Sequence, residues 1–149
     1  MKVKYREIQS MFISMRKVEK DKAGIRWAFA LAKNKGKIQN DIDCIIAAEK
    51  VMQETEQERI KYCNEHAVKN TSGEPVMENG YFKGVDGKAP ELVAFVEKMR
   101  KLLKEYNEML NKETEIDFHM VDFKEVPEQI APEDFANLML MIRDEETKE

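Results

Sequence analysis

The segment from Ala23 to Ala67 carries apolar residues at helical spacing and runs into a short insert rich in turn-forming residues. A second amphipathic run, from Leu92 to Leu110, follows that insert. Apolar residues that recur at steps of three and four share one face of a helix, so both runs predict long helices. Two long helices joined by a short insert predict an antiparallel helical hairpin, and therefore a chain built around an elongated interaction surface.

The front of the chain predicts a short helix that precedes the hairpin. From Tyr5 to Val18, apolar residues again recur at steps of three and four. The long run after it carries a heptad-like series, made of Leu31, Ile38, Ile45 and Met52. Gly36 interrupts this run, and a glycine costs about 1 kcal/mol relative to alanine inside a helix. The sequence leaves open whether this run is one helix or two.

The insert predicts a β-hairpin followed by a helix start. Asn79 and Gly80 both tolerate positive φ, and they lie between two short runs suited to strands. This arrangement predicts a two-residue hairpin loop with a type I′ turn. Pro90 and Glu91 then open a helix, because proline suits the first helical turn and an acid suits its positive end.

After the second long helix, the pattern predicts a strand and then a last helix. Ile116, Phe118 and Met120 alternate with other residues at a period of two, which predicts a strand over 114–123. The strand could pair with the hairpin and form a small sheet, since a lone two-stranded hairpin is marginal in water. Pro127 ends this region, and Pro132 begins the next helix.

These elements predict a mainly helical α+β fold, with a hairpin of long antiparallel helices, a small β element and short terminal helices. We expect a single domain, because 149 residues can bury a core of their own. Its predicted parts are helical residues 1–69, the β-type insert 70–88, the helix 89–112, the strand 114–123, the C-terminal helix 132–143 and the acidic tail 144–149.

Composition indicates a folded protein of the cytoplasm. Hydrophobic residues make up 42% of the chain, which is too many for a disordered chain. No apolar run approaches the roughly 18 residues that a transmembrane helix needs. The first residues lack the apolar run of a signal peptide, and Cys44 and Cys63 are the only cysteines. We therefore expect a soluble, cytoplasmic protein without disulfides and without a membrane partner.

Several stretches of the chain resemble a family of small proteins encoded by phages and prophages of low-GC bacteria. The stretches are Ala30–Asn34, a charged helix that ends at Tyr62–Ala67, Asn70–Pro75, Glu78–Tyr81, a second long helix and Val126-Pro127. The resemblance covers most of the chain and is one of layout and turn chemistry. It implies a viral origin, and the family has no established activity or functional residues to transfer.

Three residues offer the chemistry of a catalytic or metal site. Cys63 and His66 are three apart on a predicted helix, a spacing that suits two ligands of one zinc ion. The same pair, or His119 as a general base, would suit nucleophilic or acid–base catalysis. The sequence lacks a second close Cys or His pair and shows neither a lowered thiol pKa nor oxyanion donors. We therefore expect no catalytic residues, no metal ligands and no cofactor, with Cys63 buried and His66 on the surface.

Charge argues against a nucleic-acid partner. Tight non-specific binding to nucleic acid depends on many Lys and Arg contacts to phosphates, and the chain has a net charge of −4. Three lysines do surround Gly36, close to Trp27 and Phe29, and they are Lys33, Lys35 and Lys37. Lysines beside aromatic residues suit single-stranded nucleic acid. Acidic neighbours balance them, so a solvated helix surface is the simpler interpretation.

The best functional hypothesis is a non-enzymatic phage or prophage protein that acts through protein–protein contacts, in an assembly or accessory role. The candidate contact residues are Glu54, Glu56, Glu58, Phe135, Leu138, Met139, Met141 and Ile142. Heptad spacing is also compatible with a homo-oligomer, although the intramolecular hairpin would satisfy it equally well. The alternative is an inhibitor of a host enzyme or defence protein that uses acidic helix faces. A third hypothesis is a small metal-dependent enzyme that uses Cys63, His66 and His119.

Overall fold

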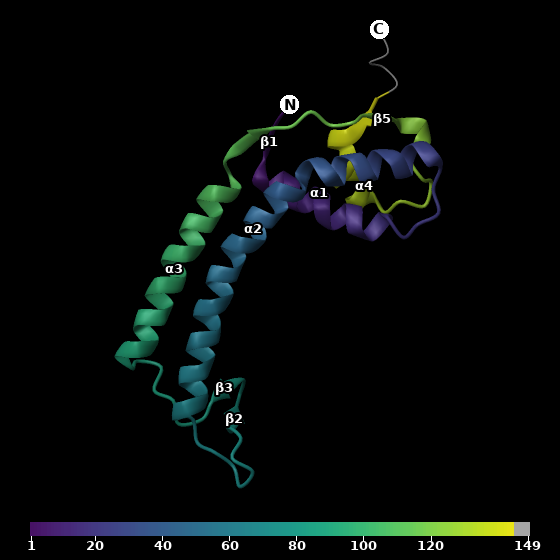
Figure 1. Ribbon diagram of the computed structural model, residues 1–149. Helices are drawn as coiled ribbons and strands as arrows, with labels where there is room; N and C mark the ends of the chain where they lie inside the picture. The colour runs from purple at the N-terminus through teal and green to yellow at the C-terminus, as the bar shows by residue number, and fades with distance from the viewer. Residues whose placement is uncertain (145–149) are drawn as a thin grey trace. The chain divides into compact units, whose positions relative to one another are not determined.

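The computed structural model describes residues 1–144, and the rest of the predicted acidic tail lies outside the described residues. The predicted mainly helical α+β fold is confirmed (Figure 1). In chain order the elements are β1 (Lys2–Lys4), α1 (Tyr5–Val18), α2 (Ile25–His66), β2 (Met77–Glu78), β3 (Tyr81–Phe82), α3 (Pro90–Leu110), β4 (Glu113–Glu115), β5 (Val121–Asp122), η1 (Phe123–Glu125), α4 (Pro132–Leu138), η2 (Met139–Met141) and β6 (Ile142–Arg143).

Contacts within the chain divide it into two compact units. Unit 1 contains Met1–Ile46 together with the chain from Glu108 onward, and unit 2 contains Ala47–Asn107. The sequence predicts one domain and gives no sign of this division. Helix α2 contributes its first half to unit 1 and its second half to unit 2.

The first two helices follow the apolar pattern of the sequence. Helix α1 has the bounds that the pattern predicts, and its buried side chains include Ile8, Met11 and Met15. Helix α2 continues through Gly36 without a break, which answers the question of one helix or two. A Cβ at Gly36 would meet no atom within 4 Å, so this glycine serves no close approach of another element.

Unit 1 holds most of the buried core. Helix α1 packs against α4, and Met15 and Val18 of α1 lie beside Trp27 and Leu31 of α2. Strand β1 pairs with β4 in an antiparallel ladder, in which Val3 faces Thr114. Strand β5 pairs with β6 in parallel. Two-stranded ladders therefore attach both ends of the described chain to the helical core.

The structure corrects two predictions for the segment after α3. The predicted strand 114–123 forms ladders only near its ends, in β4 and β5, and 116–120 belong to neither. Ile116 and Phe118 are buried while Asp117 and His119 are exposed, so the alternation marks an extended segment rather than a continuous strand. The predicted pairing with the hairpin is wrong, because β4 pairs with β1 and β5 pairs with β6.

The predicted C-terminal helix 132–143 is shorter than expected. Helix α4 ends at Leu138 and continues as a single 3₁₀ turn, after which the chain becomes extended in β6. Apolar residues at successive positions in this segment are compatible with either conformation. The parallel pairing of Ile142 with Val121, a residue distant in sequence, accounts for the extended end.

Unit 2 contains the second half of α2, the β2–β3 hairpin and most of α3. The predicted type I′ turn is confirmed, since φ is 52° at Asn79 and 81° at Gly80. Val68, just after α2, donates its amide hydrogen to the Lys83 carbonyl, and Val76 donates to the Val68 carbonyl. These bonds attach the hairpin to the chain that leaves α2.

Candidate functional site

Unit 2 has an apolar groove between α2 and α3. Figure 1 shows α3 running beside the second half of α2. The hollow has a volume of about 350 Å³. We call it the α2–α3 groove, and its lining residues are Thr55, Glu56 and Arg59 of α2 with Phe95, Val96, Met99, Arg100 and Leu103 of α3.

The apolar stripe of α3 is wider than the surface that α2 covers. Its residues form two adjacent seams with heptad-like steps of four and three. The first seam is Phe95, Met99, Leu102, Tyr106 and Met109, and each of its residues is half-buried. The second seam is Leu92, Val96, Met99, Leu103, Tyr106 and Leu110. At the middle of this second seam, Val96 is 52% exposed and Leu103 is 46% exposed.

Unit 2 buries little apolar surface of its own. Within 47–107, the only buried hydrophobic residues are Cys63, Ala67 and Leu92. Thr55 is also buried, and its hydroxyl donates to the Val51 carbonyl of the same helix at 3.2 Å. A two-helix unit with so small a core gains little stability from burial. Contact of the exposed second seam with another apolar surface would therefore stabilise unit 2.

The charged residues that line the groove are Glu56, Arg59 and Arg100. On α2, the Arg59 guanidinium donates to both carboxylate oxygens of Glu56, at 2.5 and 3.0 Å. On α3, Arg100 lies 3.7 Å from Glu97. The hydrogen bond from Arg59 lowers the pKa of Glu56, and the same bond raises the pKa of Arg59. Each charged residue of the rim therefore has a partner within its own helix.

The predicted acidic surface lies on the second half of α2. Glu54 and Glu58 are exposed and share one side of the helix. Glu56 is half-buried and binds Arg59 in the groove. The three glutamates therefore do not form one acidic patch, because the middle one belongs to the groove.

The structure divides the apolar candidates of the last helix between core and surface. Leu138 and Met141 are fully buried, which corrects their assignment to a contact surface. The reason is the packing of α4 on α1, which fills the inward positions of this segment. Phe135 is half-buried and meets Phe123 edge to face. Met139 is exposed, and Ile142 is half-buried in β6.

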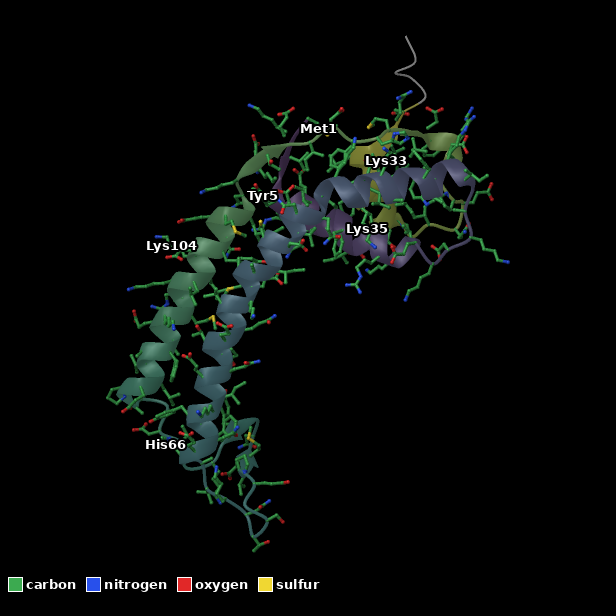
Figure 2. All side chains as sticks on the ribbon, viewed as in Figure 1. Met1, Tyr5, Lys33, Lys35, His66 and Lys104 are labelled. Atoms are coloured by element: carbon green, nitrogen blue, oxygen red, sulfur yellow. The ribbon has the colours of Figure 1, made fainter. Side chains whose placement is uncertain are left out.

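The candidate catalytic residues lie in ordinary structural surroundings. Cys63 is buried and His66 is exposed, as the sequence predicts. Figure 2 shows His66 at the end of α2. The His66 ring stacks on Tyr62, with centroids 4.1 Å apart. His119 is exposed in unit 1 and meets Phe29 edge to face at 5.2 Å. Among residues 1–144, no three His, Cys, Asp or Glu side chains are grouped so that they could hold a metal ion.

The second cysteine differs from its prediction. Cys44 falls on an apolar pattern in the sequence, which predicts a buried small hydrophobe. The structure leaves Cys44 exposed and unbonded to Cys63. Ile42 and Ile45 are buried on either side of it, so the inward face of α2 excludes position 44.

The three lysines near Gly36 each have a different partner. Figure 2 labels two of them, Lys33 and Lys35. Lys35 forms an ion pair with Glu19 at 2.9 Å. Lys37 donates to the Asp117 carbonyl. Lys33 lies over the Phe29 ring, 5.8 Å from its centroid. Trp27 is fully buried and offers no exposed ring for a base to stack on.

Comparisons with protein-family models, with curated proteins and with solved structures find no match. The resemblance to phage and prophage proteins therefore stays a prediction. Within residues 1–144, none of the helices combines the length and the apolar character needed to cross a membrane.

Proposed function

We propose that this chain is a non-enzymatic phage or prophage protein that acts through protein–protein contacts, in an assembly or accessory role. The single observation that carries the proposal is the exposed second seam of α3, in which Val96 and Leu103 face the α2–α3 groove. An apolar surface bordered by polar residues is typical of a protein contact site. The viral origin rests on the sequence resemblance alone.

The groove has the layout of a helix-binding surface. The two walls are helices, and most of the lining between them is apolar. A groove of this kind binds an amphipathic helix, whose apolar residues at steps of three and four insert into it. Phe95 and Met99 are half-buried, so part of each side chain is available to a bound helix. Aromatic residues and methionine are enriched in the cores of protein interfaces.

The alternative function is inhibition of a host enzyme or defence protein. The exposed Glu54 and Glu58 favour it, because carboxylates on one helix side can face a basic surface. Binding of this kind would weaken with added salt, whereas binding through the groove depends mainly on apolar burial.

The test is affinity purification of the tagged chain from infected or lysogenic cells, at low and high salt. It compares the wild type with a groove variant, Val96→Glu/Leu103→Glu. The matched control is Ile46→Glu/Ile60→Glu, which changes two α2 residues outside the groove that are 53% and 37% exposed. Both variants add the same charge to half-exposed apolar positions.

The proposal expects stoichiometric virion or assembly proteins with the wild type and the control, and their loss with the groove variant. A host enzyme that is released by salt from all three proteins would support the inhibitor instead. Equal recovery of assembly proteins with the wild type, the groove variant and the control would show that the groove does not contribute to the contact. Recovery of no stoichiometric partner would overturn a function through contacts with other proteins.

A further inference from the structure

We infer that Asn79 is a site of spontaneous covalent modification, at which the side-chain amide is lost and the position becomes a mixture of aspartate and isoaspartate. The site is the turn of the β2–β3 hairpin, where Gly80 follows Asn79. This inference goes beyond the proposed function and does not depend on the α2–α3 groove.

The reaction needs only the two turn residues and water. The Gly80 backbone nitrogen gives up its proton to hydroxide and attacks Cγ of Asn79. The new bond closes a five-membered succinimide ring, and the bond between Cγ and Nδ2 breaks as ammonia leaves with a proton from water. A second water molecule then opens the ring. Attack at Cγ gives aspartate on a normal backbone, whereas attack at the backbone carbonyl carbon gives isoaspartate, whose main chain runs through Cγ.

Both reacting groups are accessible and unbonded in the structure. Asn79 is exposed, and among residues 1–144 no hydrogen bond or ion pair holds its side chain. Within the same residues, the Gly80 amide hydrogen has no backbone acceptor. A Cβ at Gly80 would meet no atom within 4 Å, so the surroundings of this residue are open. Glycine has no side chain to hinder the approach of its nitrogen to Cγ.

The hairpin turn can open far enough for the ring to close. A ring that includes the Asn79 backbone does not fit a type I′ turn, so the turn must first leave the conformation that the structure shows. Strands β2 and β3 have two residues each, paired as Met77 with Phe82 and Glu78 with Tyr81. So short a hairpin is marginally stable, and exposed loop tips open locally at a low cost in free energy.

The other asparagines lack this combination of features. Asn79 is the only asparagine of the chain that precedes a glycine. Asn34 is buried, and its carboxamide binds two backbone groups. Asn70 is exposed, but its Oδ1 accepts the amide hydrogens of Ser72 and Glu74, both at 3.0 Å. These bonds oppose the rotations that ring closure requires, so we expect the reaction at Asn79.

The two products should have different effects on the hairpin. Aspartate before glycine suits a type I′ turn as well as asparagine does. Isoaspartate lengthens the backbone of the loop, and loop length determines the register of a hairpin. The Val68 amide donates to the Lys83 carbonyl, and the Lys83 amide donates to Val76. Hydrogen exchange at the Val68 and Lys83 amides should therefore be faster in the isoaspartate form than in the aspartate form.

The test is peptide mapping by mass spectrometry of the purified full chain during incubation at mildly alkaline pH. Digestion at acidic pH stops further reaction, and electron-transfer fragmentation separates isoaspartate from aspartate. The expected result is a progressive loss of the Asn79 amide while Asn34 and Asn70 keep theirs. The loss should slow as the pH is lowered toward mildly acidic values, because the deprotonated nitrogen is the attacking group. Asn79→Asp provides the reference for the aspartate form.

The matched control is Thr71→Gly, which places a glycine after Asn70 and keeps Ser72 and Glu74 as donors to its Oδ1. In the folded variant, Asn70 should lose its amide more slowly than Asn79. In concentrated urea, the two should lose it at similar rates. Equal rates in the folded variant would overturn the claim that the structure selects Asn79. So would a folded wild type that keeps the Asn79 amide over a period in which the urea-unfolded chain loses it.

Discussion

The side chain of Asn34 forms two hydrogen bonds with the backbone of His119. Its Nδ2 donates to the His119 carbonyl oxygen at 2.8 Å, and its Oδ1 accepts from the His119 amide at 2.7 Å. Asn34 is fully buried in α2, within unit 1. The carboxamide therefore does for the backbone of His119 what a neighbouring strand does in a sheet. Elsewhere in 116–120, Met1 bonds the Ile116 backbone and Lys37 donates to the Asp117 carbonyl.

Replacing Asn34 by alanine should lower the free energy of unfolding by about 2–4 kcal/mol, because two partly buried backbone groups lose their partner and a cavity forms. Asn34→Asp should also destabilise the chain at neutral pH. It removes the donor and sets a carboxylate against the His119 carbonyl. Urea unfolding followed by circular dichroism measures both effects.

The control for this prediction is Asn40→Ala, at an exposed position of the same helix. It should change the free energy of unfolding by less than about 0.5 kcal/mol. Equal effects at positions 34 and 40 would mean that the Asn34 hydrogen bonds add nothing measurable to stability.

This pair of residues also explains a limit of sequence-based prediction. The alternation predicts correctly which side chains are buried from Ile116 to His119. It fails at the end of the segment, where Met120 is only half-buried and Val121 is buried. It cannot predict that an asparagine on a helix binds the backbone of that segment, because this contact joins residues 85 positions apart. The pairing of β1 with β4 is missed for the same reason.

Local chemistry predicts other elements well. Asn79 and Gly80 determine the hairpin turn through their tolerance of positive φ. Pro132 begins α4 in the structure as in the sequence analysis. The end of α4 is not determined locally, because Ile142 pairs with Val121 rather than continuing the helix.

The groove itself could have been found from the sequence. The stripe of α3 contains two adjacent seams, and the neighbouring Phe95–Val96 and Leu102–Leu103 pairs show its width. One partner helix covers a single seam, so a wider stripe indicates a second contact. The contact residues expected from the sequence lie instead on the second half of α2 and in the last helix, because a hairpin with α2 is enough to explain an apolar stripe on α3.

A buried polar cluster joins α1 to α4, and its loss should destabilise unit 1. The Ser14 hydroxyl donates to Asp134 Oδ1 at 2.8 Å and accepts from Asn137 Nδ2 at 3.0 Å. Both Ser14 and Asp134 are buried. Ser14→Ala should cost about 1–3 kcal/mol of unfolding free energy, because it removes a donor from a buried carboxylate. Thermal and urea unfolding measure the loss.

Ser10→Ala is the matched control, since Ser10 is a half-buried serine of the same helix. Asp134→Asn, which retains an acceptor oxygen for Ser14, should be milder than Asp134→Ala. If the two Asp134 variants are equally unstable, the hydrogen bond from Ser14 is not the source of the effect.

The Glu56–Arg59 pair on the groove rim should make stability depend on pH. Hydrogen bonding to Arg59 lowers the pKa of Glu56 from its ordinary value of 4.5. A lowered pKa in the folded state means that the pair stabilises the fold above the ordinary value and loses this effect as pH falls through the folded-state value. Because both side chains are partly exposed, Glu56→Gln should cost less than about 1 kcal/mol at neutral pH.

Urea unfolding of the wild type and Glu56→Gln at neutral pH and near pH 3 checks this prediction. The difference between the two proteins should shrink in acid. Glu58→Gln, on the exposed side of the same helix, should show a smaller difference at neutral pH. A difference for Glu56→Gln that grows in acid would have the wrong sign for this pair.

Gly84 should be the glycine of unit 2 that is least tolerant of alanine. Its φ is 83°, a conformation that side chains rarely adopt, and an added Cβ would lie 2.8 Å from Cγ2 of Val68. Gly80 has a similar φ of 81°, but its Cβ would meet no atom within 4 Å. Gly80→Ala should cost about 1 kcal/mol through backbone strain, and Gly84→Ala should cost more because it adds a steric clash.

The steric part of this effect can be separated by a double-mutant cycle with Val68→Ala. Removing the Val68 methyl groups should recover part of the cost of Gly84→Ala and none of the cost of Gly80→Ala. Hydrogen exchange at the amides of Val68 and Lys83 reports the local opening, since Val68 donates to Lys83 and Lys83 to Val76. Equal coupling of Val68→Ala to both glycine variants would show that the cost at Gly84 arises from backbone conformation rather than from contact with Val68.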